Sequence, residues 1–225
     1  MHNIFNVLII DDHPAIIDIY KIALERLNSI NNSFCFRVES ANSCQEALEK
    51  LNYKSTDFQF DLIFLDIRIP PSDDGKILGG EDLGLKIREE HDDVKIIVLT
   101  SYNDNFLLNN IIKTINPEGF LIKTDFGFDE IVEAIKIVLI DPPYYSRSII
   151  KLLRKQMSND FTIDSLDRQL LYHLSIGTKT KDLPDVLPLS IAGIERRKRH
   201  LKNALNTGSK DDNVLIQIAK EKGFV

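Results

Sequence analysis

The sequence of 225 residues predicts an α/β doubly wound five-stranded parallel sheet followed by a small all-α domain. Short apolar segments alternate with amphipathic segments over residues 1–140, which is typical of right-handed βαβ units. After residue 160 the apolar residues keep only the helical period. We therefore expect domains over residues 1–140 and 161–225, joined by a linker helix or hinge over residues 141–160.

The charge distribution supports the same division. Residues 1–140 hold 24 Asp and Glu against 13 Lys and Arg, a net charge of −11, whereas residues 141–225 hold 10 against 15, a net charge of +5. An acidic half joined to a basic half indicates a nucleic-acid partner for the second half.

The composition points to a cytoplasmic protein without a membrane partner. A hydrophobic content of 43% is enough to fill two cores. No apolar run approaches the roughly 18 residues of a membrane span, and no basic leader precedes the first strand. Cys35 and Cys44 are too few for a disulfide framework and lack metal-binding spacing, so we interpret them as incidental thiols in a reducing compartment.

Four strand-like apolar segments each end on polar residues. The segments cover residues 5–10, 62–65, 94–99 and 118–122, and a fifth strand is expected over residues 34–38. The polar residues at their carboxyl ends are, in chain order, Asp11, Asp12, Asp66, Thr100 and Lys123. Because the carboxyl ends of parallel strands share one edge of the sheet, we expect these side chains to meet there.

This set of side chains suits a divalent cation together with a phosphoryl group. Mg²⁺ prefers about six oxygen ligands at roughly 2.0–2.1 Å, which the three carboxylates can supply in part. Thr100 and Lys123 could then hold phosphoryl oxygens. For His13, we favour a solvent-facing loop histidine over a metal ligand.

Amphipathic segments separate the strands. Pro14 suits the first turn of the first helix, in which apolar residues recur at three-to-four spacing, and Ser43 caps the second helix. Further helices are expected over residues 81–90, 104–113 and 128–140. Strand and helix therefore alternate to the end of the first domain.

With this arrangement, residues 1–140 resemble the receiver domain of two-component response regulators, which has a flavodoxin-like fold. The resemblance implies that Asp66 is the phosphoacceptor, supplied by a sensor histidine kinase, and that activation produces a homodimer. It implies Mg²⁺ bound through Asp11, Asp12, Asp66 and the backbone carbonyl of Arg68. The implied switch and phosphoryl-binding residues are Thr100, Phe120 and Lys123.

Two features depart from the usual receiver pattern. The loop over residues 70–80 is several residues longer than usual, and it either shapes kinase access and phosphoryl lifetime or is a tolerated surface insertion. Arg68 follows Asp66 by two residues, where hydrolases that form an aspartyl phosphate usually carry a second Asp. Such a hydrolase remains an alternative function.

The second domain is expected to contain a helix over 165–176, Gly177, a short helix, Pro188, a helix from 190 to about 206, and a helix over 212–219. This pattern resembles the four-helix helix-turn-helix domain of the LuxR/NarL type. The resemblance implies that the helix after Ser190 enters the major groove of promoter DNA. The implied DNA contacts are Ser190, Glu195, Arg196, Arg197, Arg199 and Lys202.

Two residues of this helix are unusual for the type. Gly193 replaces a threonine, and Glu195 replaces a lysine that faces the groove. Glu195 would repel phosphate, although it can accept a hydrogen bond from the cytosine amino group. A phosphorylation-dependent transcriptional regulator, and not an enzyme, is the expected function, with a protein-binding second domain as an alternative.

Overall fold

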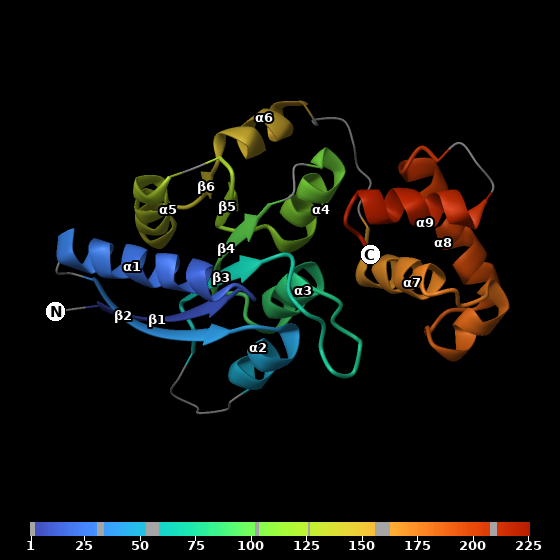
Figure 1. The fold of residues 1–225 in the computed structure, drawn as a ribbon, viewed down its shortest axis with the longest axis horizontal. Helices are drawn as coiled ribbons and strands as arrows, with labels where there is room; N and C mark the ends of the chain where they lie inside the picture. Colours follow the sequence, from blue (N-terminus) through green and yellow to red (C-terminus); the bar gives the residue numbers. More distant parts are fainter. Residues whose placement is uncertain are drawn as a thin grey trace. The chain divides into compact units, whose positions relative to one another are not determined.

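A computed structural model describes the chain over residues 3–30, 34–52, 59–101, 104–125, 127–155, 163–207 and 211–225. These residues form two compact units (Figure 1). The first unit comprises Met1–Asn103 and Ile115–Lys155, and the second comprises Asp104–Thr114 and Gln156–Val225. The chain therefore enters the second unit twice.

The first unit is built on a parallel sheet, as predicted. Its strand order is β2-β1-β3-β4-β5-β6, and each described pair of neighbouring strands is parallel. The strands are β1 (Asn3–Ile10), β2 (Phe34–Ala41), β3 (Leu62–Asp66), β4 (Lys95–Thr100), β5 (Gly119–Ile122) and β6 (Tyr144–Tyr145).

The described sheet has six strands, whereas the sequence predicted five. Strand β6 pairs with Gly119 and Phe120 of β5 through only two residues. Two residues are too few to show a period, and the preceding Pro142 and Pro143 indicate only the end of a helix. The doubly wound parallel architecture itself is confirmed.

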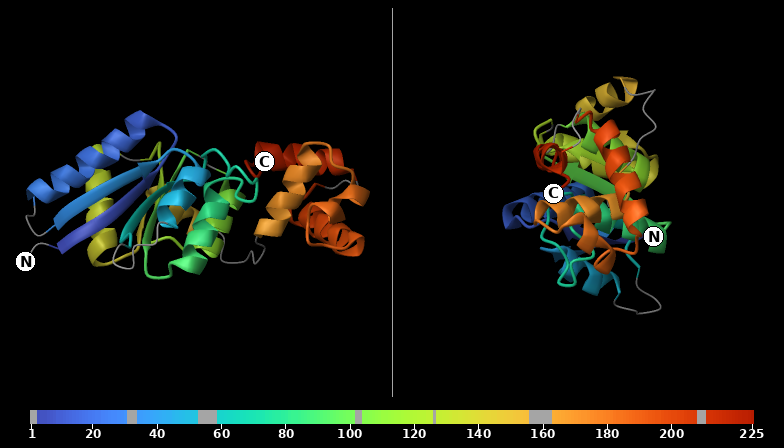
Figure 2. Two further views of the ribbon diagram at one scale, coloured as in Figure 1. Left: turned by 90° about the horizontal axis from the view of Figure 1, so that it is seen from below. Right: turned by 90° about the vertical axis from the view of Figure 1, so that its right-hand side faces the viewer.

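The sheet is buried on both faces, which explains why its strands are apolar throughout. All five residues of β3 are buried, as are five of the six residues of β4. Figure 1 shows α1 (Pro14–Ile30) and α5 (Phe128–Ile140) on one face, and α2 (Cys44–Leu51) and α3 (Gly80–Glu90) on the other. Figure 2 shows α1 lying along β1 and β2.

Helices α1 and α5 each bury one apolar stripe against the sheet. The apolar stripe of α1 packs with that of α5 and with side chains of β1, β3 and β4 in one core. Ser43 caps α2, because its hydroxyl accepts a hydrogen bond from the backbone N–H of Glu46 at 3.2 Å. The buried residues of the two stripes are Ile17, Tyr20, Ala23, Leu24, Leu27, Ile131, Val132, Ala134, Ile135 and Val138.

The linker predicted over residues 141–160 contains β6 and a further helix. This helix, α6 (Arg147–Lys155), belongs to the first unit, and its residues Ile149 and Leu152 are buried. Residues 156–162 lie outside the described residues, so the boundary at residue 160 stays a prediction.

The second unit is helical. It contains almost all of α4 (Asn105–Ile115), together with α7 (Ser165–Ser175), the 3₁₀ helix η1 (Thr180–Asp185), α8 (Ile191–Ala204) and α9 (Asp212–Glu221). Pro184 lies inside η1, where its missing N–H fits a short 3₁₀ turn better than an α-helix. The apolar core of the second unit includes Leu170, Leu171, Leu174, Leu183, Leu187, Ile194, Leu201, Leu205 and Leu215.

Three side-chain contacts join the α4 segment to the rest of the second unit. The fully buried Asn110 amide donates to the carbonyl of Ile163 at 3.1 Å and accepts from its N–H at 2.5 Å. The rings of Phe106 and Phe224 meet edge to face, with centroids 5.6 Å apart. Lys222 of the C-terminal segment forms an ion pair of 2.8 Å with Asp104.

Cys44 is buried, Cys35 is partly buried, and both thiols are free. Among the helices that the structure describes, none has the length and apolar character needed to cross a bilayer.

A single arginine connects several segments at the amino-terminal edge of the sheet. The Arg88 guanidinium donates to the carbonyls of Ile115, Asp92 and Val94, each at 3.1 Å. It also contacts the Glu118 carboxylate at 2.9 Å. The planar fork of arginine allows one side chain to satisfy all these acceptors.

We predict that Arg88→Lys lowers the free energy of unfolding by about 1–3 kcal/mol, because the carbonyls of the buried residues Ile115 and Val94 lose their donors. Urea unfolding measures this loss. Lys86→Gln is the matched control on the same helix, since the partner of Lys86 among the described residues is the exposed Glu90, and the substitution should matter by less than about 0.5 kcal/mol. Equal effects of the two substitutions would contradict the assignment.

Candidate functional site

The predicted polar residues all lie at the carboxyl edge of the sheet. Asp11 and Asp12 follow β1, Asp66 ends β3, Thr100 ends β4, and Lys123 follows β5. Strands β2 and β3 flank β1 on opposite sides, so the strand order reverses at β1, which is where ligands bind in doubly wound sheets.

An ion-pair network holds the centre of the site. The Lys123 ammonium lies 2.8 Å from Asp11 Oδ2 and 2.6 Å from Asp66 Oδ2. Asp11 is 1% exposed and Asp66 is 5% exposed, so this contact is shielded from bulk water. The backbone N–H of Lys123 donates to the carbonyl of the buried Thr100 at 2.7 Å, which connects β4 to the site.

Burial and ion pairing change the pKa of Asp66 and of Lys123 in a way that suits a reactive carboxylate. Burial raises the pKa of the Asp66 carboxyl above its ordinary value, and hydrogen bonds from Lys123 and from the Arg68 N–H oppose this shift only in part. Burial lowers the pKa of the Lys123 ammonium, but hydrogen bonds to Asp11 and Asp66 outweigh it, so this pKa lies above its ordinary value. Lys123 therefore remains a cation.

The acidic residues form a group that fits a divalent cation. Ligand atoms of Asp11, Asp12, His13 and Asp66 all lie within 4.8 Å of one another. Three carboxylates against the single Lys123 ammonium leave two excess negative charges, and carboxylate oxygens are the hard ligands that Mg²⁺ prefers. The residues present therefore fit Mg²⁺.

His13 is closer to the acidic pair than the sequence suggested. Its side chain is exposed, as expected for a loop residue, yet Nδ1 lies 2.5 Å from Asp12 Oδ1 and 3.3 Å from Asp11 Oδ1. Its backbone N–H also donates to Asp11 Oδ1 at 3.0 Å. The only sequence signal for this contact was that His13 directly follows the two aspartates.

The long loop after Asp66 is held at several points. The carbonyl of Pro70 accepts from the N–H of Cys44 at 2.9 Å, and the N–H of Asp73 donates to the side chain of Gln45 at 3.2 Å. Both contacts attach the loop to the start of α2. The loop ends at Gly80, where an added Cβ would lie 2.0 Å from the carbonyl oxygen of Asp66.

Arg68 and Phe120 occupy positions consistent with their predicted roles, which stay predictions. The Arg68 N–H donates to Asp66 Oδ1 at 3.1 Å, so its backbone borders the acidic group. Phe120 of β5 is completely buried, beside β4 and β6. Any rotation of this ring would therefore require its neighbours to move.

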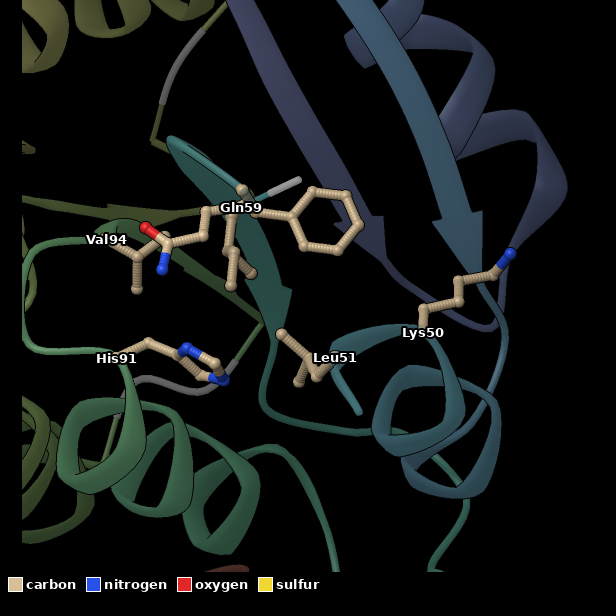
Figure 3. Close-up of a pocket in the computed structure, with 7 residues that line it drawn as sticks. Lys50, Leu51, Gln59, His91 and Val94 are labelled. Atoms are coloured by element: carbon tan, nitrogen blue, oxygen red, sulfur yellow. The ribbon is translucent and has the colours of Figure 1, made fainter. Parts of the chain in front are cut away.

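A small hollow at the opposite end of β3 is not a candidate binding site. It has a volume of about 30 Å³, which is room for a water molecule and little more. Figure 3 shows the side chains of Lys50, Leu51, Gln59, His91 and Val94 around it. The hollow lies beside the first residues of β3, whereas Asp66 ends the same strand.

The predicted DNA-contacting residues lie on α8, which starts where expected. The hydroxyl of Ser190 accepts from the N–H of Gly193 at 3.2 Å and caps the helix. Ile194 and Leu201 are buried in the core of the second unit, whereas Glu195, Arg196 and Arg199 are exposed.

Two of the four cations among the predicted DNA contacts are paired inside the second unit. Arg197 forms ion pairs of 2.7 Å with both Asp164 and Asp167. Lys202 forms one of 2.6 Å with Asp212. A contact of either side chain with DNA would compete with these pairs.

Comparison with known proteins identifies the family. Residues 7–136, more than half of the chain, match the response regulator receiver domain. The chain belongs to the response regulator family. This response regulator is 26% identical to the transcriptional regulatory protein ComA of Bacillus subtilis (strain 168), over 97% of this chain and 99% of ComA. It is 23% identical to the oxygen regulatory protein NreC of Staphylococcus epidermidis, over 96% of this chain and 97% of NreC.

Solved structures share the fold of the response regulator over nearly its whole length. RcsB from Salmonella enterica serovar Typhimurium, bound to the promoter rprA in the presence of the phosphomimetic BeF3−, has a TM-score of 0.66 at 21% identity. That match covers 96% of this chain and 98% of RcsB. RcsB bound to the promoter P1flhDC gives a TM-score of 0.65 at 21% identity, covering 97% and 100%. A receiver fold followed by a helical region is therefore confirmed.

We predict that Gly80→Ala disrupts the site, because the new methyl group collides with the backbone of Asp66 and not with a flexible side chain. The free energy of unfolding should fall by about 1–3 kcal/mol, as for other overpacked positions. Thermal or urea unfolding measures this change. Gly127→Ala is the control, because nothing lies within 4 Å of its added Cβ; a loss as large as that of Gly80→Ala would contradict the steric argument.

Proposed function

We propose that this response regulator accepts a phosphoryl group on Asp66 from a sensor histidine kinase and then binds promoter DNA as a homodimer. The observation that supports this most is the buried Asp66 carboxylate, held by Lys123 beside a second buried carboxylate at the strand-order reversal. The family membership of the chain supports the same reaction.

The transfer follows from the chemistry of the two partners. A carboxylate oxygen of Asp66 attacks the phosphorus of the phosphohistidine, so that a P–O bond forms while the P–N bond breaks and the electron pair returns to the imidazole. Lys123 already contacts Asp66 Oδ2, so its ammonium is placed to bind a phosphoryl oxygen. The Thr100 hydroxyl and the Phe120 ring would respond to the product.

The acidic residues have a separate role in this proposal. Asp11, Asp12, Asp66 and the Arg68 carbonyl would hold Mg²⁺, whose positive charge would offset the negative charge of the carboxylates and of an incoming phosphoryl group. In its absence, the two excess negative charges of the group would repel a phosphoryl donor. Phosphorylation is therefore expected to require the metal.

The output follows from the second half of the chain. We assign residues 1–140 to the receiver, 141–160 to a linker and 161–225 to the DNA-binding domain. This last segment holds 11 Lys and Arg against 8 Asp and Glu, and its net charge of +3 suits a phosphate backbone. ComA is named as a transcriptional regulatory protein, and the RcsB structures contain promoter DNA, which supports the same output. Such a function places the protein in the cytoplasm, where a kinase and the chromosome are both available.

Neither alternative from the sequence has comparable support. Hydrolases that form an aspartyl phosphate usually carry a second Asp two residues after the nucleophile, and this chain has Arg68 at that position. The match of residues 7–136 to the receiver domain also favours regulation over turnover of small phosphate esters. A protein-binding output would be indicated if the phosphorylated protein failed to bind DNA.

We predict that acetyl phosphate labels the protein only in the presence of Mg²⁺, and that Asp66→Asn abolishes the label because an amide oxygen is a poor nucleophile. Radiolabelling or a phosphate-affinity gel measures the product. Asp61→Asn is the matched control, since Asp61 immediately precedes the other end of β3 and should leave labelling intact. Undiminished labelling of the Asp66→Asn protein would exclude Asp66 as the acceptor.

We also predict that beryllofluoride, which mimics the phosphoryl group, shifts the protein from monomer to dimer at micromolar concentration. A ligand that favours one pre-existing conformation by a few kcal/mol can shift the population this far. Sedimentation velocity measures the mass, with the Asp66→Asn protein as the control that should not respond. An unchanged mass for the unaltered protein would count against activation by dimerisation.

A further inference from the structure

The basic run of α8 separates into two sets by its surroundings. Arg196 and Arg199 are exposed, and within the part of the chain that the structure describes neither forms an ion pair. The other three cations, Arg197, Lys198 and Lys202, each contact at least one carboxylate of the second unit. The sequence gives no sign of this division, because all five cations lie within one short run.

Arg197 contacts the first turn of α7. Its Nη1 lies 2.7 Å from Asp164 Oδ2 and 2.7 Å from Asp167 Oδ1, and the Asp167 side chain is only 6% exposed. The same two aspartates cap α7, since Asp164 Oδ1 accepts from the N–H of Asp167 at 2.8 Å and Asp167 Oδ2 accepts from the N–H of Asp164 at 3.4 Å. Arg197 therefore joins the middle of α8 to a capping box through charge-assisted hydrogen bonds.

Lys198 and Lys202 anchor a different side of the helix. Both ammonium groups lie 2.6 Å from the carboxylate of Asp212, the first residue of α9. Lys198 also donates to the hydroxyl of Thr180 in η1 at 3.0 Å. The buried residues Ile194 and Leu201 form the apolar seam of α8. Ion pairs on both sides of this seam fix the rotation of α8 about its own axis.

The side of α8 opposite the seam carries a stripe with the spacing i, i+4, i+7 and i+11. All four of its residues are exposed. At 3.6 residues per turn these positions fall within a narrow sector of the helix surface. The stripe is Ala192, Arg196, Arg199 and Asn203. A hollow of about 530 Å³ is lined by Arg196, Arg199 and Asn203 of the stripe, and on its other side by His200 and by Arg197 with its partners Asp164 and Asp167.

We propose that Arg197 is a positioning residue, held by Asp164 and Asp167, and that the stripe of Ala192, Arg196, Arg199 and Asn203 is the face that reads DNA. The proposal rests on the DNA-binding function proposed above and deepens it. Arg197 and Lys202, which the sequence predicted as DNA contacts, are then structural residues. Ala192 and Asn203 are added to the DNA contacts.

The chemistry of the stripe indicates which base edges it can read. Arginine pairs in bidentate fashion with guanine O6 and N7, and asparagine pairs with adenine N6 and N7. The methyl group of Ala192 can pack against a thymine methyl group. Glu195 borders the stripe and forms an ion pair of 3.2 Å with Lys198, so part of its charge is offset before DNA arrives.

The test compares two arginines two positions apart in the full-length protein loaded with beryllofluoride. Binding to a duplex of mixed sequence is measured by fluorescence anisotropy over a range of salt concentrations, and thermal unfolding is recorded in parallel. Arg199→Gln should reduce the slope of log K against log salt by about 1 and leave the thermal midpoint unchanged. Arg197→Gln should weaken binding by about tenfold, lower the thermal midpoint and leave the slope unchanged.

Two further variants separate positioning from general damage. Arg197→Lys keeps a charge beside the carboxylates and should recover part of the lost midpoint and affinity. Asp167→Asn should lower the midpoint, and combining it with Arg197→Gln should add little, because both remove the same ion pair.

The results can contradict the proposal in distinct ways. If Arg197→Gln reduces the salt slope as Arg199→Gln does while its midpoint stays unchanged, Arg197 contacts DNA directly and the positioning role is wrong. If Arg199→Gln changes neither slope nor affinity, the stripe is not the reading face. If the unaltered protein binds no duplex even at low salt, the DNA-binding function itself is wrong, and the reading face with it.

Discussion

The contact of the Lys123 ammonium with the carboxylates of Asp11 and Asp66 is the interaction on which the first unit depends. The strands that carry these carboxylates are packed on both faces, so the two charges cannot separate to relieve their repulsion. Lys123 balances only part of that charge. The sheet therefore holds an acidic group whose remaining negative charge suits a divalent cation, and the packing of the strands keeps the carboxylates in place.

The second unit shows that net charge overstates the surface available to DNA. Its basic helix carries five cations within one run, but three of them already neutralise carboxylates of neighbouring helices. Those pairs orient the helix, and the two remaining arginines provide the accessible charge. Some cations of α8 thus orient the helix, and others are available to attract DNA. Both sets have the same chemistry, because a guanidinium or ammonium group can serve either purpose.

Much of the fold of the first unit could be predicted from the sequence, because apolar strands that end on polar residues are compatible with few arrangements of a sheet. The edge where Asp11, Asp66 and Lys123 meet could be predicted for that reason. What could not be predicted depends on contacts between distant residues. The strand Tyr144–Tyr145 exists only through its pairing with β5, and the partners of Arg197 lie about 30 residues earlier in the chain, where no local pattern indicates them.

The burial of Asn110 also has a consequence for dissection of the protein. Its amide satisfies both backbone groups of Ile163, and Phe106 packs on Phe224, so α4 finds these partners in a part of the chain that follows the sheet. A fragment that ends before residue 163 would keep α4 but lose every one of these partners. The Asn110 amide and the Phe106 ring would lose these contacts and become more exposed to water. A receiver isolated by cleavage therefore differs from the receiver within the intact chain.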